Sequence, residues 1–297
     1  MDPECQSFRL NRSDFLKTST APALEVFFCL REIAMNQLEI ETAARHAWPA
    51  LQEVELDCGV LRFARGVSRR ANFFNPFPAF RHEPEALVRL TERFFNRYEL
   101  PSIVRIVAAN SGSTGKFAEL DACLAAQNYI LMTTTRVMTR SLPWQPLPDT
   151  TPENARISAV DLDSWLRCWH WLTGRTHAEL VVHRAMLGRL QGKHTLLVQS
   201  TTSGQWLSCG MAVVAGNLLG IFGIATAPEA RGQGLATNLV RQLLSWGIHN
   251  SCNTAYLQVE CANAPAIAVY EKLGFAEAYR YWYREKPFNQ LHKQETE

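Results

Sequence analysis

The sequence has no long apolar run, and it has no excess of charge of one sign. No apolar stretch approaches the roughly 18 residues that a membrane-spanning helix needs, so we expect no membrane partner. Lysine and arginine number 30 against 28 aspartates and glutamates, which gives a net charge of +2. With no stripe of alternating basic and aromatic residues, this balance offers little support for a nucleic-acid partner.

Paired cysteines are also missing. The eight cysteines are scattered and contain no Cys-x-x-Cys pair, so the spacing of a zinc site is absent and we expect no metal. The chain starts Met1-Asp2-Pro3-Glu4, without the positive and apolar regions of a secretory signal. We therefore expect reduced thiols in a cytoplasmic protein.

A proline-rich segment divides the chain. Residues 142–152 hold four prolines in eleven positions, which neither a helix nor a central strand accommodates. We expect a linker there, between a first lobe at 22–141 and a second at 153–287. The ends, 1–21 and 288–297, are expected to be flexible.

Hydrophobic periodicity predicts the elements of both lobes. In the first lobe we expect helices at 38–47, 84–100 and 117–126 and strands at 59–64, 102–109 and 129–138. In the second lobe we expect helices at 162–172, 178–190, 234–247 and 264–273, and strands at 195–199, 205–214, 217–226, 255–260 and 278–285. A strand–helix–strand order ends both lobes, which is a weak indication of duplication.

One glycine-rich turn points to a ligand. Ala230-Arg231-Gly232-Gln233-Gly234-Leu235-Ala236 connects the strand at 217–226 to the helix at 234–247. Glycine allows a tight turn and a close approach by a ligand. The amides at the start of a helix, together with the positive end of its dipole, form a seat for a diphosphate. Arg231 would add a fixed positive charge. Taken alone, the glycines are also compatible with an ordinary loop.

With Thr226 and Pro228, the turn has the pattern Val/Thr-x-Pro-x-x-Arg-Gly-x-Gly-x-Ala, and it resembles the coenzyme-A loop of the GNAT N-acetyltransferase superfamily. The resemblance implies that the coenzyme A pyrophosphate is bound by the amides of Arg231, Gly232, Gln233, Gly234, Leu235 and Ala236. It implies that the pantetheine arm pairs with the backbone of Ile224, Ala225 and Thr226. One amide of that strand would act as an oxyanion donor to the thioester carbonyl.

A second signature runs from Asn263 to Phe275 and resembles the Asn-x-x-Ala-x-x-x-Tyr-x-x-x-Gly-Phe helix of the same superfamily. The resemblance implies that Asn263 and Ala266 contact the coenzyme and that Tyr270 lies beside its sulfur. A thiol has a reference pKa of about 8.5 and a phenol one of about 10, so the phenol can return a proton to the leaving thiolate. The alternative for Tyr270 is simple core packing.

The general base is less firmly placed. Many members of the superfamily carry a carboxylate on the strand before the coenzyme loop, where this chain has the apolar run 218–222. The nearest acidic candidate is Glu260, at the end of the strand at 255–260. It would bind the ammonium of the substrate or take its proton through water. The alternative is a solvated glutamate at a strand end.

The first lobe has no Arg-Gly-x-Gly turn, so we expect it to be a degenerate copy without coenzyme. Its Arg70-Ala71-Asn72 cluster either reaches the cleft and binds an acidic group of the substrate, or forms a structural turn. Near the last strand, Trp282 and Tyr283 belong either to the core or to a pocket.

These features predict an α+β protein of two tandem GNAT-like lobes, each a mostly antiparallel twisted sheet flanked by helices. The predicted activity is transfer of acetyl from acetyl-CoA to a primary amine of a small molecule or peptide, by direct attack in a ternary complex. The alternative is a regulatory protein that binds acyl-CoA with little turnover. The sequence is also compatible with a homodimer.

Overall fold

A computed structural model describes residues 37–108, 115–142 and 155–288. The strands of the first lobe are β1 (Gln52–Leu56), β2 (Gly59–Phe63), β3 (Phe73–Pro76), β4 (Ser102–Val107), β5 (Ile130–Leu131) and β6 (Thr135–Ser141). Those of the second are β7 (Ala155–Ala159), β8 (His194–Thr201), β9 (Trp206–Ala215), β10 (Leu218–Thr226), β11 (Thr254–Glu260) and β12 (Ala276–Lys286). They form one sheet in the order β1-β2-β3-β4-β12-β6-β11-β10-β9-β8-β7, with β5 beside β12.

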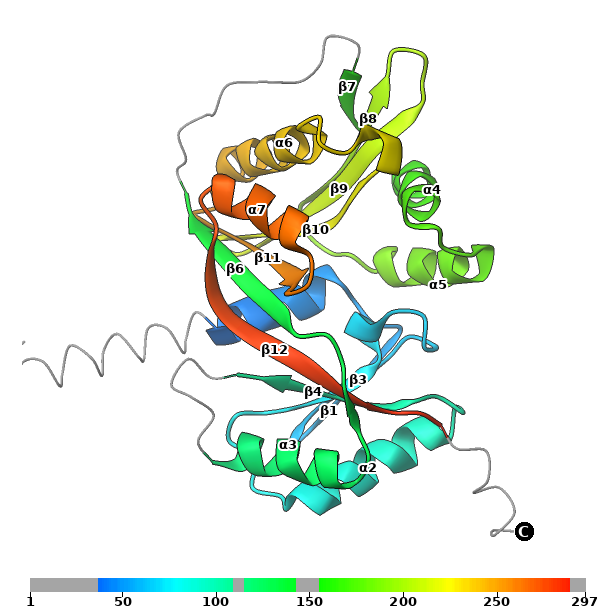
Figure 1. The fold of residues 1–297 in the computed structure, drawn as a ribbon, viewed down its shortest axis with the longest axis vertical. Coiled ribbons are helices and arrows are strands. Elements are labelled where there is room, and N and C mark those ends of the chain that lie inside the picture. Colours follow the sequence, from blue (N-terminus) through cyan, green and yellow to red (C-terminus); the bar gives the residue numbers. More distant parts are fainter. Residues whose placement is uncertain (1–36, 109–114, 143–154, 289–297) are drawn as a thin grey trace, which may run out of the picture.

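The two lobes exchange strands at the centre of this sheet. β6, from the first lobe, lies between β11 and β12 of the second. The first half of β12 pairs with β6, and its second half continues into the first lobe, where it lies between β4 and β5. Figure 1 shows β12 as the long strand that crosses from one lobe to the other beside β6. Each lobe's part of the sheet therefore includes a strand that the other lobe contributes.

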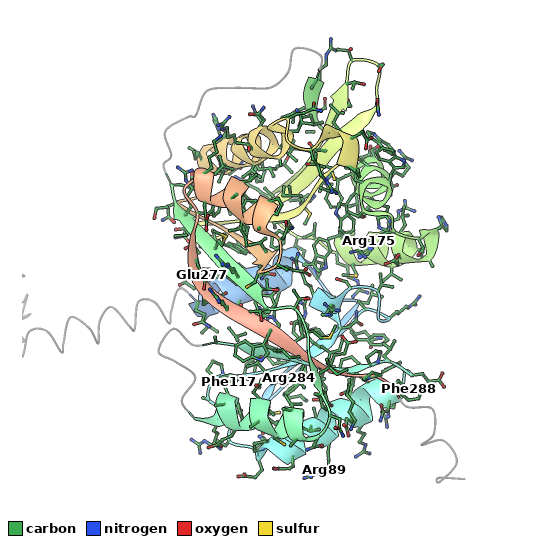
Figure 2. All side chains as sticks on the ribbon, viewed as in Figure 1. Arg89, Phe117, Arg175, Glu277, Arg284 and Phe288 are labelled. Carbon is green, nitrogen blue, oxygen red and sulfur yellow. The ribbon has the colours of Figure 1, made fainter. Side chains whose placement is uncertain are left out.

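Side chains at both ends of β12 fix this exchange. In the second lobe, Glu277 accepts from Arg280 at 2.5 Å and lies 3.3 Å from Arg136 of β6. In the first lobe, Arg284 Nη2 donates to Asp121 Oδ2 at 2.7 Å. Figure 2 places Glu277 and Arg284 in different lobes along the one strand. The last strand is thus anchored by ion pairs in both lobes.

The helices cover the sheet in separate groups (Figure 1). Their bounds are α2 (Pro84–Asn96), α3 (Lys116–Ala126), α4 (Leu162–Thr173), α5 (His177–Leu187), α6 (Leu235–His249) and α7 (Ala264–Lys272). α2 and α3 pack on the first lobe, α4 and α5 on one face of the second lobe, and α6 and α7 on its other face. A helix over residues 37–47 lies between the lobes and shares a core with α4 and β12. No helix in the described ranges has the length and apolar character to cross a membrane.

The predicted α+β fold of tandem lobes with a mostly antiparallel sheet is confirmed, since parallel pairing among the described strands is confined to β3–β4 and β10–β11. The prediction of one strand at 129–138 is wrong, because that segment forms β5 and β6 with a break between them. β1, β3 and β7 were not predicted. Each has only four or five residues, and most of β1 is solvent-exposed, so the apolar pattern there is weak.

The helix predicted at 84–100 ends earlier, at Asn96. Glu99 adopts a left-handed backbone with φ 55°, which an α-helix cannot continue. Of the predicted linker at 142–152, all but Leu142 lies outside the described residues, so the division of the chain at that point stays a prediction.

A buried histidine pair lies where α4 and α5 meet. His170 Nε2 and His183 Nδ1 are 3.1 Å apart, and Trp169 packs against both rings. His183 is 0% exposed. Burial, assisted by the positive charge of Arg175, lowers the pKa of His183 to about 4. The folded protein therefore keeps this imidazole neutral at pH values where the unfolded chain binds a proton.

This pair predicts a loss of stability in mild acid. Because the folded pKa of His183 lies below the unfolded value near 6.5, its contribution is complete above pH 6.5 and is lost as the pH falls toward 4. Over this window the free energy of unfolding of the wild type should fall by up to about 1.4 kcal/mol per pH unit more steeply than that of His183→Gln. Urea titrations at several pH values measure the slopes. The same substitution at the exposed His177 is the control, and equal slopes for the wild type and His183→Gln would refute the prediction.

Candidate active site

The glycine-rich turn lies on the surface, and within it the amide of Arg231 donates to the backbone oxygen of Pro228. Arg231, Gly232, Gln233 and Gly234 are all exposed. Gly234 is the N-cap of α6 in a left-handed conformation, with φ 78°, and no described side chain caps this helix. By contrast, α4, α5 and α7 are each capped by the side chain of an Asp, Thr or Asn. The start of α6 therefore has backbone N–H groups that no side chain caps, and these groups can donate hydrogen bonds to an anion.

A β-bulge interrupts β10 just before this turn. Phe222 is paired with Met211, but Ala225 is paired with Cys209, so β10 has one residue more than β9 in this interval. Gly223 lies in the bulge with φ 61°, and a Cβ there would be 2.7 Å from the ring of Trp165. Only glycine satisfies both the backbone angle and this close contact. The packing of α4 against β10 therefore depends on a glycine in this bulge.

Strands β10 and β11 separate where the bulge begins. Their parallel pairing runs from Leu218–Thr254 to Ile221–Leu257. β10 continues to Thr226 and β11 to Glu260, and within the described structure no pairing joins these outer parts. The half-buried residues 223–226 therefore have a backbone edge that no strand covers on the β11 side. An extended ligand can pair with this edge as a strand would.

The helix α7 carries Tyr270. Tyr270 is 7% exposed and packs against Phe275, yet its hydroxyl makes no hydrogen bond with any described residue. Burial raises the pKa of Tyr270 to about 12, and the charge of Arg70 opposes this rise. The phenol therefore keeps its proton at neutral pH. Asn263, at the start of α7, accepts from the amide of Ala266 at 3.2 Å and so caps the helix.

A small cavity lies on the other face of the sheet, between the two lobes. The helix over 37–47, β2, β3, β4 and the 3-10 turn η2 (Arg69–Ala71) line it from the first lobe, and β12 crosses its wall. From the sheet of the second lobe it receives Phe222 of β10 and Gln258 of β11. These are the first residues beyond the last paired residues, Ile221 and Leu257. The cavity thus meets the point where the strands separate.

A buried ion pair supports one side of the cavity. Arg105 donates to both oxygens of Glu41, at 2.5 and 3.0 Å, and the hydroxyl of Tyr279 donates to Glu41 at 2.7 Å. The guanidinium also lies 3.8 Å from the ring centroid of Tyr281. Burial alone would lower the pKa of Arg105, but the charge and hydrogen bonds of Glu41 raise it overall. The Arg105 guanidinium is therefore charged in the folded protein.

The cluster Arg70-Ala71-Asn72 forms a structural turn at the edge of the cavity, and the binding of an acidic group there stays a prediction. Asn72 is buried, and its Oδ1 accepts from the amides of Ala64 and Gly66 at 2.7 and 2.9 Å, so it holds a structural turn. Arg70 extends from this turn into the cavity, where its Nη2 is 3.4 Å from the backbone oxygen of Gln258. No motif indicated this cavity, because its residues come from segments of both lobes.

Trp282 and Tyr283 point to opposite faces of β12. The indole of Trp282 donates to Asp121 of α3 at 2.8 Å and packs on the core of the first lobe. Tyr283 lines the cavity. Alternation along the strand explains the difference.

Glu260 is exposed at the end of β11, on the face of the strand that carries Gln258 but two residues farther along. It is not among the residues that line the cavity. A group that could hold a metal ion lies elsewhere: Asp57, Cys58 and His82 have ligand atoms within 4.8 Å of one another at the β1–β2 turn. The predicted absence of a metal stays a prediction.

Most of the chain matches one family of acetyltransferases. A family model described as "Probable histone acetyltransferase Rv0428c C-terminal" matches residues 36–284. The chain belongs to this family. The resemblance to the GNAT superfamily and the expectation of an enzyme are thereby confirmed, and the protein is a GNAT-type acetyltransferase.

Two relatives in sequence carry the same kind of activity in their names. YobR of Bacillus subtilis, an uncharacterized N-acetyltransferase, is 26% identical over 257 residues, which are 84% of this chain and 98% of YobR. The ribosomal protein bS18-alanine N-acetyltransferase of Escherichia coli K12 is 35% identical over 88 residues, or 30% of this chain. The match covers 60% of the length of that second protein.

Solved structures show the same fold. A GCN5-related N-acetyltransferase from Kribbella flavida aligns with a TM-score of 0.59 and 12% identity over 89% of this chain and 97% of that one. A tandem GNAT protein from the clavulanic acid biosynthesis pathway aligns with a TM-score of 0.54 and 16% identity, covering 71% of this chain and 73% of that one. The second comparison supports the arrangement of tandem lobes.

Proposed function

We propose that this acetyltransferase moves an acetyl group from acetyl-CoA to a primary amine by direct attack, with both substrates bound at once. The observation that carries the proposal is the separation of β10 and β11 beside the uncapped start of α6. The exposed turn fits a diphosphate, and the open backbone edge fits an extended arm. The cavity on the opposite face adjoins the point where the strands separate, which is the side from which the amine would approach.

Each predicted residue has a role in this proposal. The amides from Arg231 to Ala236 bind the pyrophosphate, and the arm lies along Ile224, Ala225 and Thr226, with Asn263 and Ala266 beside it. Acetyl-CoA supplies a thioester whose carbonyl carbon the amine attacks, so that a C–N bond forms as the C–S bond breaks. An amide of the bulge donates to the carbonyl oxygen as negative charge develops there. The Tyr270 hydroxyl gives its proton to the departing sulfur and regains one from solvent.

The amine must lose a proton before or during attack, and Glu260 stays the proposed base. It lies two residues beyond Gln258 on the same face of β11, about 7 Å along the strand. At that separation it would act through water. The names of the relatives favour turnover over the alternative of an acyl-CoA-binding regulatory protein.

Binding of acetyl-CoA provides the first test. At about 100 times its dissociation constant, a ligand adds about 2.7 kcal/mol to the free energy of unfolding. For a chain of this size we therefore expect the melting temperature to rise by about 5–10 °C. Arg231→Glu should abolish the rise, because it places a negative charge beside the bound diphosphate. Gly234→Asp should also abolish it, because the new carboxylate adds a negative charge and competes for the amides at the start of α6.

The matched control is Gly216→Asp, the same change at an exposed glycine of positive φ in the β9–β10 turn. This variant should keep the full rise. An unchanged melting curve of the wild type in acetyl-CoA would refute the proposed function. Coenzyme binding without thiol release from any amine would instead favour the regulatory alternative.

A further inference from the structure

Among the arginines that line the cavity, Arg70 has no carboxylate partner within the described part of the chain. The other arginines that line it are in the pairs Arg105–Glu41, Arg62–Glu53 and Arg45–Glu53. Arg70 forms no ion pair with any described residue, and its hydrogen bond to the backbone of Gln258, at 3.4 Å, uses one of five N–H donors. Its charge and its remaining donors therefore stay available to a ligand.

Arg70 is held in position before any ligand binds. Its own backbone oxygen accepts from Nη1 of Arg62 at 2.7 Å. Asn72 closes the turn on either side, since it accepts from two amides and its Nδ2 donates to the oxygen of Ser68 at 2.6 Å. A guanidinium on such a fixed turn loses little backbone freedom when a ligand binds, which favours affinity.

A second, independent feature of the cavity, the hydroxyl of Tyr283, also indicates a ligand there. Tyr283 is 4% exposed and lines the cavity, yet its hydroxyl makes no hydrogen bond of ordinary geometry with the described residues. A buried hydroxyl without a partner costs free energy that an acceptor on a ligand would recover. Arg70 and Tyr283 both line this cavity, so one ligand there can contact both groups.

Building on the function proposed above, we propose that the acceptor is a small primary amine that carries an oxyanion, and that this anion binds to Arg70 and Tyr283. A carboxylate or a phosphate supplies the required chemistry. Because Arg70 contacts Gln258, the first residue beyond the paired part of β11, the anion site adjoins the point where the amine meets the thioester. The amine and the anion are therefore only a few bonds apart in the acceptor.

The surrounding charge supports an anionic acceptor over a polycation. Four arginines line the cavity, and the carboxylates paired with them are only those of Glu41 and Glu53. A polyamine or an aminoglycoside would add positive charge to this excess. An amine that carries a carboxylate or phosphate compensates it instead.

Paired amines test the proposal directly. Thiol release is measured with acetyl-CoA for glycine and glycinamide, for L-alanine and L-alaninamide, and for phosphoethanolamine and ethanolamine. In each pair the anion makes the amine more basic, so intrinsic reactivity does not favour the anionic member. We expect kcat/KM to favour that member by about 10- to 100-fold in at least one pair, as for one charge-assisted bidentate contact. The third pair separates phosphate from carboxylate.

Variants identify the residue responsible. Arg70→Gln should reduce the preference to within about threefold, mainly through KM, and Arg70→Lys should keep part of it because it keeps the charge but not the fork of donors. The matched control is Arg89→Gln, on the exposed face of α2 away from the cavity (Figure 2), which should keep the full preference. A preference that survives Arg70→Gln, or the absence of any preference for the anion, overturns the proposal.

A binding measurement separates this proposal from the proposed function, because it needs neither acetyl-CoA nor turnover. Isothermal titration compares N-acetylglycine with N-acetylglycinamide, and N-acetylphosphoethanolamine with N-acetylethanolamine. In at least one pair the anionic compound should bind about tenfold more tightly to the wild type, with the difference lost in Arg70→Gln. Equal affinities in both pairs overturn the anion site even where acetyl-CoA binds as proposed. If acetyl-CoA fails to bind but the difference is present, the proposed function fails and the anion site stands.

Discussion

Tyr270→Phe is expected to lower kcat by about 10²- to 10³-fold and to leave the affinity for acetyl-CoA within about twofold. The hydroxyl lies in a buried site, and its raised pKa, about 12, keeps the proton on the phenol throughout the assay range. Without that proton the sulfur must leave as an unprotonated thiolate. The loss therefore falls on the chemical step, and single-turnover kinetics with acetyl-CoA in excess measures it.

The wild-type pH profile gives a second check on this role. Because the pKa of Tyr270 is raised to about 12, its ionisation should not reduce the rate below about pH 11, and the rate should rise with pH as more amine loses its proton. Tyr98→Phe, the same change at an exposed tyrosine of the first lobe, is the control and should leave kcat unchanged. A kcat within threefold of the wild type for Tyr270→Phe would show that Tyr270 only packs in the core.

Glu41→Gln is expected to lower the free energy of unfolding by about 3–5 kcal/mol, the largest stability effect that the structure indicates for a single polar change. The substitution leaves the buried charge of Arg105 without a carboxylate partner among the described residues, although Asn75 and the ring of Tyr281 still contact it, and it weakens the contact from Tyr279. Urea denaturation followed by fluorescence or circular dichroism measures the loss.

Two further variants make this result specific. Asp163→Asn breaks the exposed bridge to Arg184 and should cost less than about 1 kcal/mol. Replacing both buried partners, as Glu41→Leu with Arg105→Met, should recover much of the lost stability, because an apolar pair carries no desolvation penalty. If Glu41→Gln alone costs less than 1 kcal/mol, the pair is solvated and does not support the cavity.

The candidate coenzyme site could be predicted from the sequence because its parts are local. The turn from Arg231 to Ala236 and the helix that carries Tyr270 are each continuous segments with a fixed spacing, and both occur in the predicted elements. Residues that act through backbone amides need only the correct turn and helix start. The roles assigned to these residues stay predictions, and so does that of Glu260, which the structure places at an exposed strand end.

The cavity could not be predicted, because its residues are distant in the chain. Arg70 contacts Gln258, and Glu41 contacts Tyr279, across separations of 188 and 238 residues. Periodicity indicates which face of a strand is buried but not which segment covers it. The sequence alone therefore allowed two alternative interpretations for Arg70 and two for Tyr283.

By itself, the sequence determined the superfamily, the order of most helices and strands in the second lobe, and the turn that fits a diphosphate, because short-range spacing and backbone conformation decide these features. Only the tertiary structure decided that β6 and β12 are exchanged between the lobes. That exchange brings the helix over 37–47 and η2 against the separated strands, and it creates a cavity whose Arg70 guanidinium pairs with no carboxylate of the described ranges. Which strands pair depends on contacts between segments far apart in the chain, and local sequence patterns do not specify those contacts.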